Sequence, residues 1–127
     1  MTEAVIDFKD YDSYYLICIG DEGVSLEMVW AVYSFWDRIC FYTQLNDPEF
    51  LPHRKLLLAA INRGISAGLI EIDAANLLRR SDRFKSIISL LREPGIGEHD
   101  LAEKIDQYLT TRVWHTVTQS QLSDLHA

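Results

Sequence analysis

The sequence predicts a single, mainly α domain of the α+β class, with several helices and a small antiparallel sheet. Four stretches carry apolar residues at helical spacing, whereas three short runs are rich in β-branched and aromatic residues. The chain has 127 residues, 48% of them hydrophobic, which is enough to bury the core of one domain. We expect residues 1–13 to form a short strand, a helical turn or an N-terminal arm, and residues 119–127 to form a frayed tail.

The run SLEMVWAVYSFWDRICFY, residues 25–42, is the densest apolar stretch and predicts a helix. Ser25 is a good N-cap, and polar residues fall within one narrow stripe of the helix. We therefore expect the helix to be covered on most of its circumference, with the indole of Trp36 buried. This pattern predicts that the other elements pack against residues 25–42.

The remaining elements follow from apolar periodicity and turn residues. The run YYLICI, residues 14–19, favours a strand, with a short helix as the alternative. The other expected elements are a helix over 53–67, a strand over 69–72, a helical segment from Asp73 through Leu78, a helix over 82–92 capped by Ser81, a helix over 100–109 and a strand over 111–118. Gly68 is placed to end the first of these helices, and Gly64 within it predicts close approach by another element, the 25–42 helix.

Charge is unevenly distributed along the chain. The net charge is −7, and residues 1–30 hold seven acids against Lys9 alone. This balance argues against general nucleic-acid binding, which requires Lys and Arg to neutralise phosphates. An acidic surface attracts basic partners instead. The candidate partner-binding residues are Asp10, Asp12, Asp21 and Glu22.

Basic residues gather in two other places. The 53–67 helix offers Arg54, Lys55, Asn62 and Arg63, which would be the contact residues if the chain bound nucleic acid. A second group comprises Arg79, Arg80, Arg83 and Lys85, and we interpret it as a solvated helix face.

No catalytic or metal-binding motif is recognisable in the sequence. Phosphate-binding, dinucleotide-binding, nucleophile-elbow and calcium-loop patterns are missing, and the four histidines lack metal-ligand spacing. Cys18 and Cys40 lie in apolar runs, which favours buried thiols over a nucleophile or a disulfide. We therefore predict a protein that is not an enzyme and uses no cofactor or metal. The N-terminus lacks the pattern of a signal peptide and no membrane segment is recognisable, so we expect a cytoplasmic protein.

Three short segments, in order, carry a resemblance to a known group of proteins. They are an acid-Gly turn with a Ser-Leu helix start (Asp21, Glu22, Gly23, Ser25, Leu26), the segment ISAGLIEI over 65–72, and VWHTVT over 113–118. This order resembles small bacterial immunity proteins of toxin–immunity pairs, with a winged-helix-like layout in which a hairpin follows the last helix. That layout implies that the strand at Ile70 pairs with the strand at Val113.

The resemblance implies that the chain is a non-enzymatic, antitoxin-like protein. Such a protein binds and neutralises a basic toxin domain, for example a nuclease, by protein–protein interaction. The alternative is a winged-helix-type nucleic-acid-binding regulator with 53–67 as its recognition helix.

Overall fold

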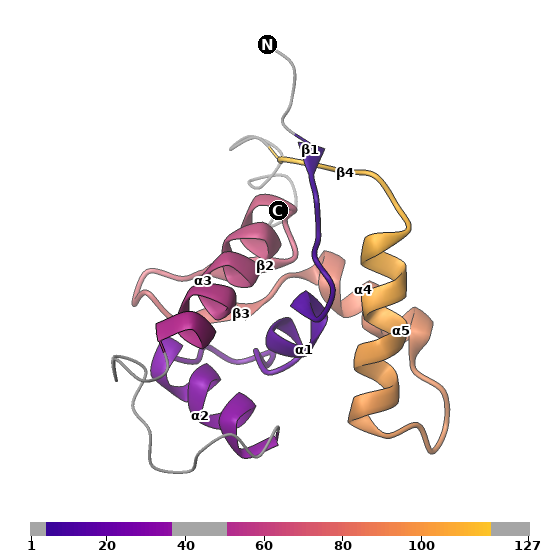
Figure 1. Cartoon of the computed structure of the whole chain (residues 1–127), viewed down its shortest axis with the longest axis horizontal. Coiled ribbons are helices and arrows are strands. Elements are labelled where there is room, and N and C mark those ends of the chain that lie inside the picture. The colour runs from indigo at the N-terminus through magenta and orange to yellow at the C-terminus, as the bar shows by residue number, and fades with distance from the viewer. Residues whose placement is uncertain (1–4, 37–50, 118–127) are drawn as a thin grey trace.

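The computed structural model describes residues 5–36 and 51–117, apart from the side chains of residues 34–36 and 51–53. This part of the chain is mainly helical, which confirms the predicted fold class (Figure 1). The helices are α1 (Asp12–Leu16), α2 (Leu26–Trp36), α3 (Leu51–Ser66), α4 (Asp82–Leu91) and α5 (Glu98–Thr110). The strands are β1 (Val5–Ile6), β2 (Ile70–Ile72), β3 (Leu78–Arg80) and β4 (Trp114–His115).

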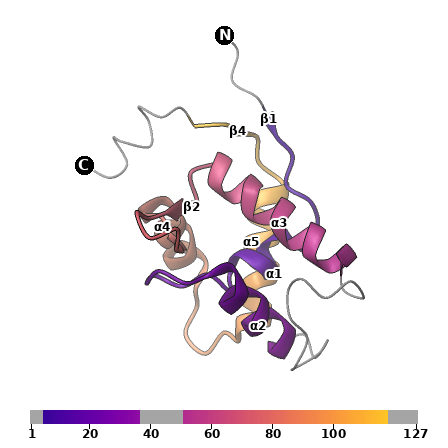
Figure 2. The ribbon, with the colours of Figure 1, turned by 90° about the vertical axis from the view of Figure 1, so that its left-hand side faces the viewer.

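The short helix α1 lies at the centre of the molecule and packs against both α3 and α5 (Figures 1 and 2). Leu16 and Ile19 are completely buried. The preferred strand over 14–19 was therefore wrong, and the helical alternative holds for the first half of this run. A helix suits the buried site because it satisfies backbone groups locally, as in the bond from the Ile17 N–H to the Ser13 carbonyl.

The central position predicted for residues 25–42 belongs to α1 instead. In α2, Val29, Trp30 and Tyr33 are buried, whereas Met28 and Val32 are exposed. Over residues 26–33, this helix therefore buries one side rather than most of its circumference. Residues 37–42 and the side chain of Trp36 lie outside the described part of the chain.

The described residues form two separate two-stranded antiparallel sheets instead of one. Strands β2 and β3 form a hairpin in which Ile70 is opposite Arg80. The helical segment expected from Asp73 was wrong, because the Asp73 carboxylate instead accepts the N–H groups of Ala75 and Leu77 and closes the turn of this hairpin. A hairpin does follow α3, but its second strand is β3 and not the late strand.

The late strand pairs with the start of the described chain. Ile6 of β1 is opposite Trp114 of β4, and the strand expected over 111–118 is reduced to Trp114–His115. The indole N–H of Trp114 donates to the Leu109 carbonyl at 2.9 Å, and its ring meets Phe8 edge-on at 5.7 Å. Residues 5–6 therefore form a strand, and β1 and β4 bring the two ends of the described chain together.

Capping and turn residues explain the helix boundaries that were predicted well. Ser81 caps α4 by accepting the Phe84 N–H at 3.2 Å. Gly68 adopts a left-handed φ of 75° after α3, and the Leu69 N–H then reaches back to the Gly64 carbonyl. Gly64 is indeed closely approached, but by Leu16 of α1 and Ile70 of β2 and not by α2.

Candidate functional site

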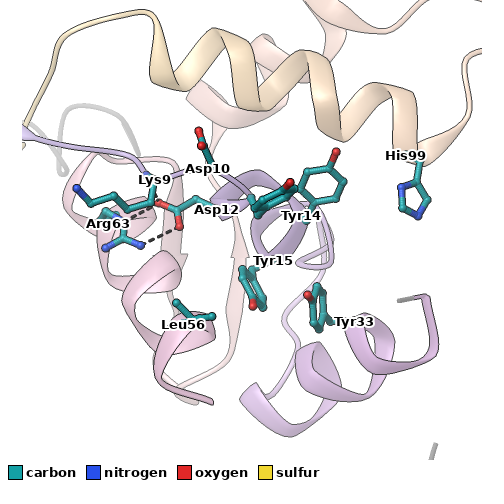
Figure 3. Close-up of a pocket in the computed structure, with 10 residues that line it drawn as sticks. Lys9, Asp10, Asp12, Tyr14, Tyr15, Tyr33, Leu56, Arg63 and His99 are labelled. Carbon is teal, nitrogen blue, oxygen red and sulfur yellow. Dashed lines mark hydrogen bonds and ion pairs between the residues drawn. The ribbon is translucent and has the colours of Figure 1, made fainter. Parts of the chain in front are cut away.

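A pocket of about 570 Å³ opens between α1, α2, α3 and α5 (Figure 3). Four of its lining residues are tyrosines, contributed by α1, the turn before it and α2. The lining residues are Lys9, Asp10, Tyr11, Asp12, Tyr14, Tyr15, Tyr33, Leu56, Arg63 and His99. We call this cavity the tyrosine pocket.

Aromatic rings form two walls of the tyrosine pocket. The buried rings of Tyr15 and Tyr33 stack with their centroids 4.4 Å apart. Nearer the solvent, the ring of Tyr14 lies 5.4 Å from Tyr11 and 5.9 Å from His99. Such rings supply large, rigid contact area together with polar groups, which is why tyrosine is enriched at protein interfaces.

A buried ion pair forms the α3 side of the pocket. Arg63 donates from Nε and Nη2 to the Asp12 carboxylate at 2.6 and 2.8 Å, and Asp12 is only 3% exposed. The carboxylate also accepts the backbone N–H of Lys9. The hydrogen bond that Arg63 donates to Asp12 raises the pKa of Arg63. Asp12 is therefore not the surface contact residue that the sequence had suggested. Arg63, which is far away in the sequence, holds it inside the fold.

Tyr11 stands at the rim in a strained backbone conformation. Its φ is 73°, which is uncommon for a bulky residue and costs ~1–3 kcal/mol. The Asp106 carboxylate of α5 accepts the Tyr11 N–H at 3.0 Å. The Ser13 hydroxyl donates to the Ala102 carbonyl at 2.9 Å and also ties this turn to α5. These bonds hold the ring of Tyr11 at the pocket mouth, where the residue is 66% exposed.

The α5 side of the pocket is acidic. Burial raises the pKa of Tyr14, and the carboxylates of Glu103, Asp106 and Asp100 raise it further. Burial also raises the pKa of Asp106, with the nearby Asp10 carboxylate as a further cause. The effect of these carboxylates on the two pKa values indicates negative potential on this side. We call Asp10, Asp100, Glu103 and Asp106 the acidic rim; Asp10 lines the pocket, and the other three lie on α5 outside its lining.

The other side of the pocket carries little net charge. Lys9 pairs with Asp7 at 2.7 Å, and Arg63 pairs with Asp12. The charges of these four groups cancel. Among the described residues, the carboxylates of the acidic rim are therefore the charged groups in and beside the pocket that lack an oppositely charged partner.

The structure separates the acidic residues that the sequence grouped together. Asp10 lines the pocket, whereas Asp21 and Glu22 follow α1 and are exposed outside the pocket lining, with Asp21 3.7 Å from Arg80. The α5 acids and the tyrosines were missed. A usable signal was present, since Asp100, Glu103 and Asp106 recur at intervals of three along a helix.

The basic residues of α3 do not form one face. Arg54 and Arg63 are nine positions apart, which places them on roughly opposite sides of a helix. Lys55 and Asn62 share an exposed side. Of the four, Arg63 is already neutralised by Asp12.

All four members of the second basic group have partners within the chain. Arg79 pairs with Glu71, Lys85 with Asp82, and Arg83 donates to the Ala67 carbonyl. Arg80 donates to the Ile17 carbonyl at 2.9 Å. Arg79 and Arg80 belong to β3 and not to a helix. Arg80 ties the hairpin to the end of α1, and Arg83 ties α4 to the end of α3.

Cys18 is a free thiol that donates to the Tyr14 carbonyl at 3.3 Å. Burial raises the pKa of Cys18 to about 12, so the thiol stays protonated at neutral pH. Cys40 lies outside the described residues. Within residues 5–36 and 51–117, no three His, Cys, Asp or Glu side chains are grouped so that they could hold a metal ion.

None of the helices in the described ranges has the length and apolar character needed to span a membrane. Comparison of the chain with protein-family models, curated proteins and solved structures finds no match.

Proposed function

We propose that this chain is a cytoplasmic, antitoxin-like immunity protein that binds a basic toxin domain and neutralises it. The observation that supports this proposal is the acidic rim beside the tyrosine pocket. Carboxylates attract a basic partner, and rigid aromatic side chains provide contact area at a small cost in conformational entropy. Neutralisation would follow from occlusion of the active cleft of the toxin.

The two groups of acids have different parts in this mechanism. Asp10 belongs to the acidic rim and lines the tyrosine pocket, which supports a role in direct contact with the partner. Asp21 and Glu22 are exposed elsewhere and act through the long-range field, which raises the rate of encounter with a basic protein. Both groups contribute to the net charge of −7.

The nucleic-acid-binding alternative has weaker support. A recognition helix presents its contact residues from one side, whereas Arg54 and Arg63 project from roughly opposite sides of α3. Arg63 is also neutralised by Asp12. An electrophoretic gel shift at low salt tests this alternative directly, and the proposed function predicts no shift of DNA or RNA.

The test is co-expression with a toxin-like protein encoded beside the gene of this chain. We expect the chain to restore growth of cells that express the toxin, and purified chain to bind the toxin directly. The variant Glu103→Lys reverses one charge of the acidic rim and should weaken binding by about tenfold. Asp82→Lys makes the same charge change on α4 and serves as the control. Failure to restore growth, or equal weakening by both variants, would contradict the proposal.

A further inference from the structure

We infer that the tyrosine pocket receives the guanidinium group of an arginine side chain presented by the partner protein. This inference rests on the proposed function and adds to it the chemistry of the contact. The site would be the energetic centre of the interface, with one arginine of the partner anchored among the tyrosines.

The shape of the pocket suits a flat group on a long stem. One wall contains the stacked rings of Tyr15 and Tyr33, and the ring of Tyr14 lies nearer α5 (Figure 3). The ring of Tyr11 lies beside that of Tyr14. A volume of about 570 Å³ lies within the ~300–1,000 Å³ typical of ligand pockets. The aromatic lining can cover the methylene stem of an arginine, while ring faces contact the guanidinium plane.

The charge of the pocket selects a cation. Of the acidic rim, Asp10 lines the pocket itself, whereas Asp100, Glu103 and Asp106 lie on α5 outside the lining and raise the pKa of Tyr14. The two cations of the opposite side, Lys9 and Arg63, already pair with Asp7 and Asp12. An anionic group entering the pocket would approach the unbalanced carboxylates of the rim, whereas a cation would be stabilised by them.

Guanidinium is favoured over ammonium for two reasons. It is planar and stacks on aromatic faces, and it is more weakly hydrated, so entry into an aromatic pocket costs less. Its several N–H groups can also donate to a carboxylate such as Asp10 while the plane contacts a ring.

The pocket mouth is already in position before a ligand arrives. The Asp106 carboxylate holds Tyr11 in its left-handed conformation, and the Asp12–Arg63 pair fixes the residue that follows it. An outlier of this kind beside a cavity is a recognised mark of a functional site. Pre-positioned rings lose little freedom on binding, which favours affinity.

The test uses a small probe and the full chain, and needs no toxin. The probe is N-acetyl-arginine N-methylamide, titrated into the labelled protein and followed by NMR. The comparison probes are the lysine analogue and the citrulline analogue, which is an uncharged isostere of arginine. We expect chemical-shift changes at residues 9–15 and 99–106, with affinity for the arginine probe ~10-fold above that for citrulline and clearly above that for lysine.

Variants connect the signal to the pocket. Tyr11→Asn removes a ring and introduces a residue type that tolerates a left-handed φ, so the fold should be kept and the urea midpoint should be equal to or higher than that of the wild type. It should weaken binding of the arginine probe ~3- to 10-fold. Asp82→Asn removes one exposed negative charge on α4 and should leave the binding of the probe unchanged.

The inference is overturned if arginine and citrulline bind equally, if lysine binds as well as arginine, or if the shifts map away from the pocket. Its failure can be told apart from failure of the proposed function. A toxin bound equally well by wild type and Tyr11→Asn would overturn the pocket inference and leave the function standing. Selective arginine binding without neutralisation of a toxin would overturn the proposed function and leave the pocket inference standing.

Discussion

The pair of Asp12 and Arg63 is the residue-level contact that holds the candidate site together. Replacing Arg63 by Met would leave the Asp12 carboxylate buried without its cation. We expect a loss of ~3 kcal/mol, at the low end for broken buried pairs because the Arg63 side chain is 23% exposed. Urea denaturation measures the change. The matched control Arg79→Met breaks a pair with Glu71 whose arginine is 45% exposed, and should cost less than ~1 kcal/mol. Equal midpoints for the two variants would contradict this prediction.

The charge of Asp106 should reduce stability at neutral pH. Burial and the neighbouring Asp10 and Asp12 carboxylates raise its pKa above the ordinary value of 3.8, so the fold disfavours the charged form. A raised pKa means that the contribution of Asp106 to stability is present at low pH and is lost as pH rises through the folded-state pKa. Asp106→Asn keeps an acceptor for the Tyr11 N–H and carries no charge.

We therefore expect Asp106→Asn to have a higher urea midpoint than the wild type at neutral pH. The difference should shrink as the pH is lowered to about 3, where the wild-type carboxyl is protonated in both states. Urea denaturation at a series of pH values checks this. A variant that is less stable at neutral pH would show that the hydrogen bond from Tyr11 requires the charged form.

The individual site residues show what a sequence pattern can predict. Asp10 was proposed as a contact residue from local charge alone, and it lines the tyrosine pocket. Asp12 belongs to the same acidic pattern, but its partner Arg63 is 51 positions away and nothing local reveals it. Tyr14 and Tyr15 were interpreted only as part of an apolar run. Tyr14 is half-buried and Tyr15 is buried, and this difference depends on how α5 and α2 pack beside them.

Among the elements, those with strong local signals were predicted and those decided by packing were not. Ser81 and Gly68 mark helix ends through their own side-chain or backbone chemistry. The run 14–19 is β-branched and aromatic, yet burial between α3 and α5 makes part of it a helix. Asp73 failed as a helix cap because the same carboxylate geometry also closes turns.

The contact between α1 and α3 gives a prediction at the same scale. A Cβ added at Gly64 would lie 2.9 Å from Leu16 Cδ2 and 3.0 Å from Ile70 Cγ1. Both side chains are almost fully buried and have little room to move. The cost of overpacking, ~1–3 kcal/mol, should exceed the ~1 kcal/mol that Ala gains over Gly in a helix.

Gly64→Ala should therefore lower the urea midpoint, despite its better helix propensity. Gly20→Ala is the control, because a Cβ at Gly20 would meet nothing within 4 Å. A midpoint for Gly64→Ala at or above that of the wild type would mean that α1 and α3 can separate slightly at no cost.

At the scale of the whole molecule, the pairing of distant segments could not be predicted from the sequence. The mainly helical composition follows from periodicity, but β1 joins β4 across more than a hundred positions. Short strands of two or three residues carry too little pattern to specify their partners. The tyrosine pocket depends on four elements that meet only in the folded chain.

The net charge of −7 gives the last prediction, which concerns the kinetics of association with a basic toxin domain. Salt shortens the screening length from ~10 Å at 0.1 M to ~3 Å at 1 M. The association rate constant should therefore fall by about tenfold or more across this range, since steering acts over several ångströms. Stopped-flow mixing measures it at each salt concentration.

Two variants separate steering from contact in the same measurement. Reversing the charges of Asp21 and Glu22, which are exposed outside the pocket lining, should slow association and leave the dissociation rate unchanged. Tyr11→Asn should instead speed dissociation, because its ring is lost from the contact itself. An association rate that changes neither with salt nor with the reversed charges would contradict electrostatic steering. Faster dissociation caused by the Asp21 and Glu22 changes would place the contact surface at the end of α1 and away from the tyrosine pocket.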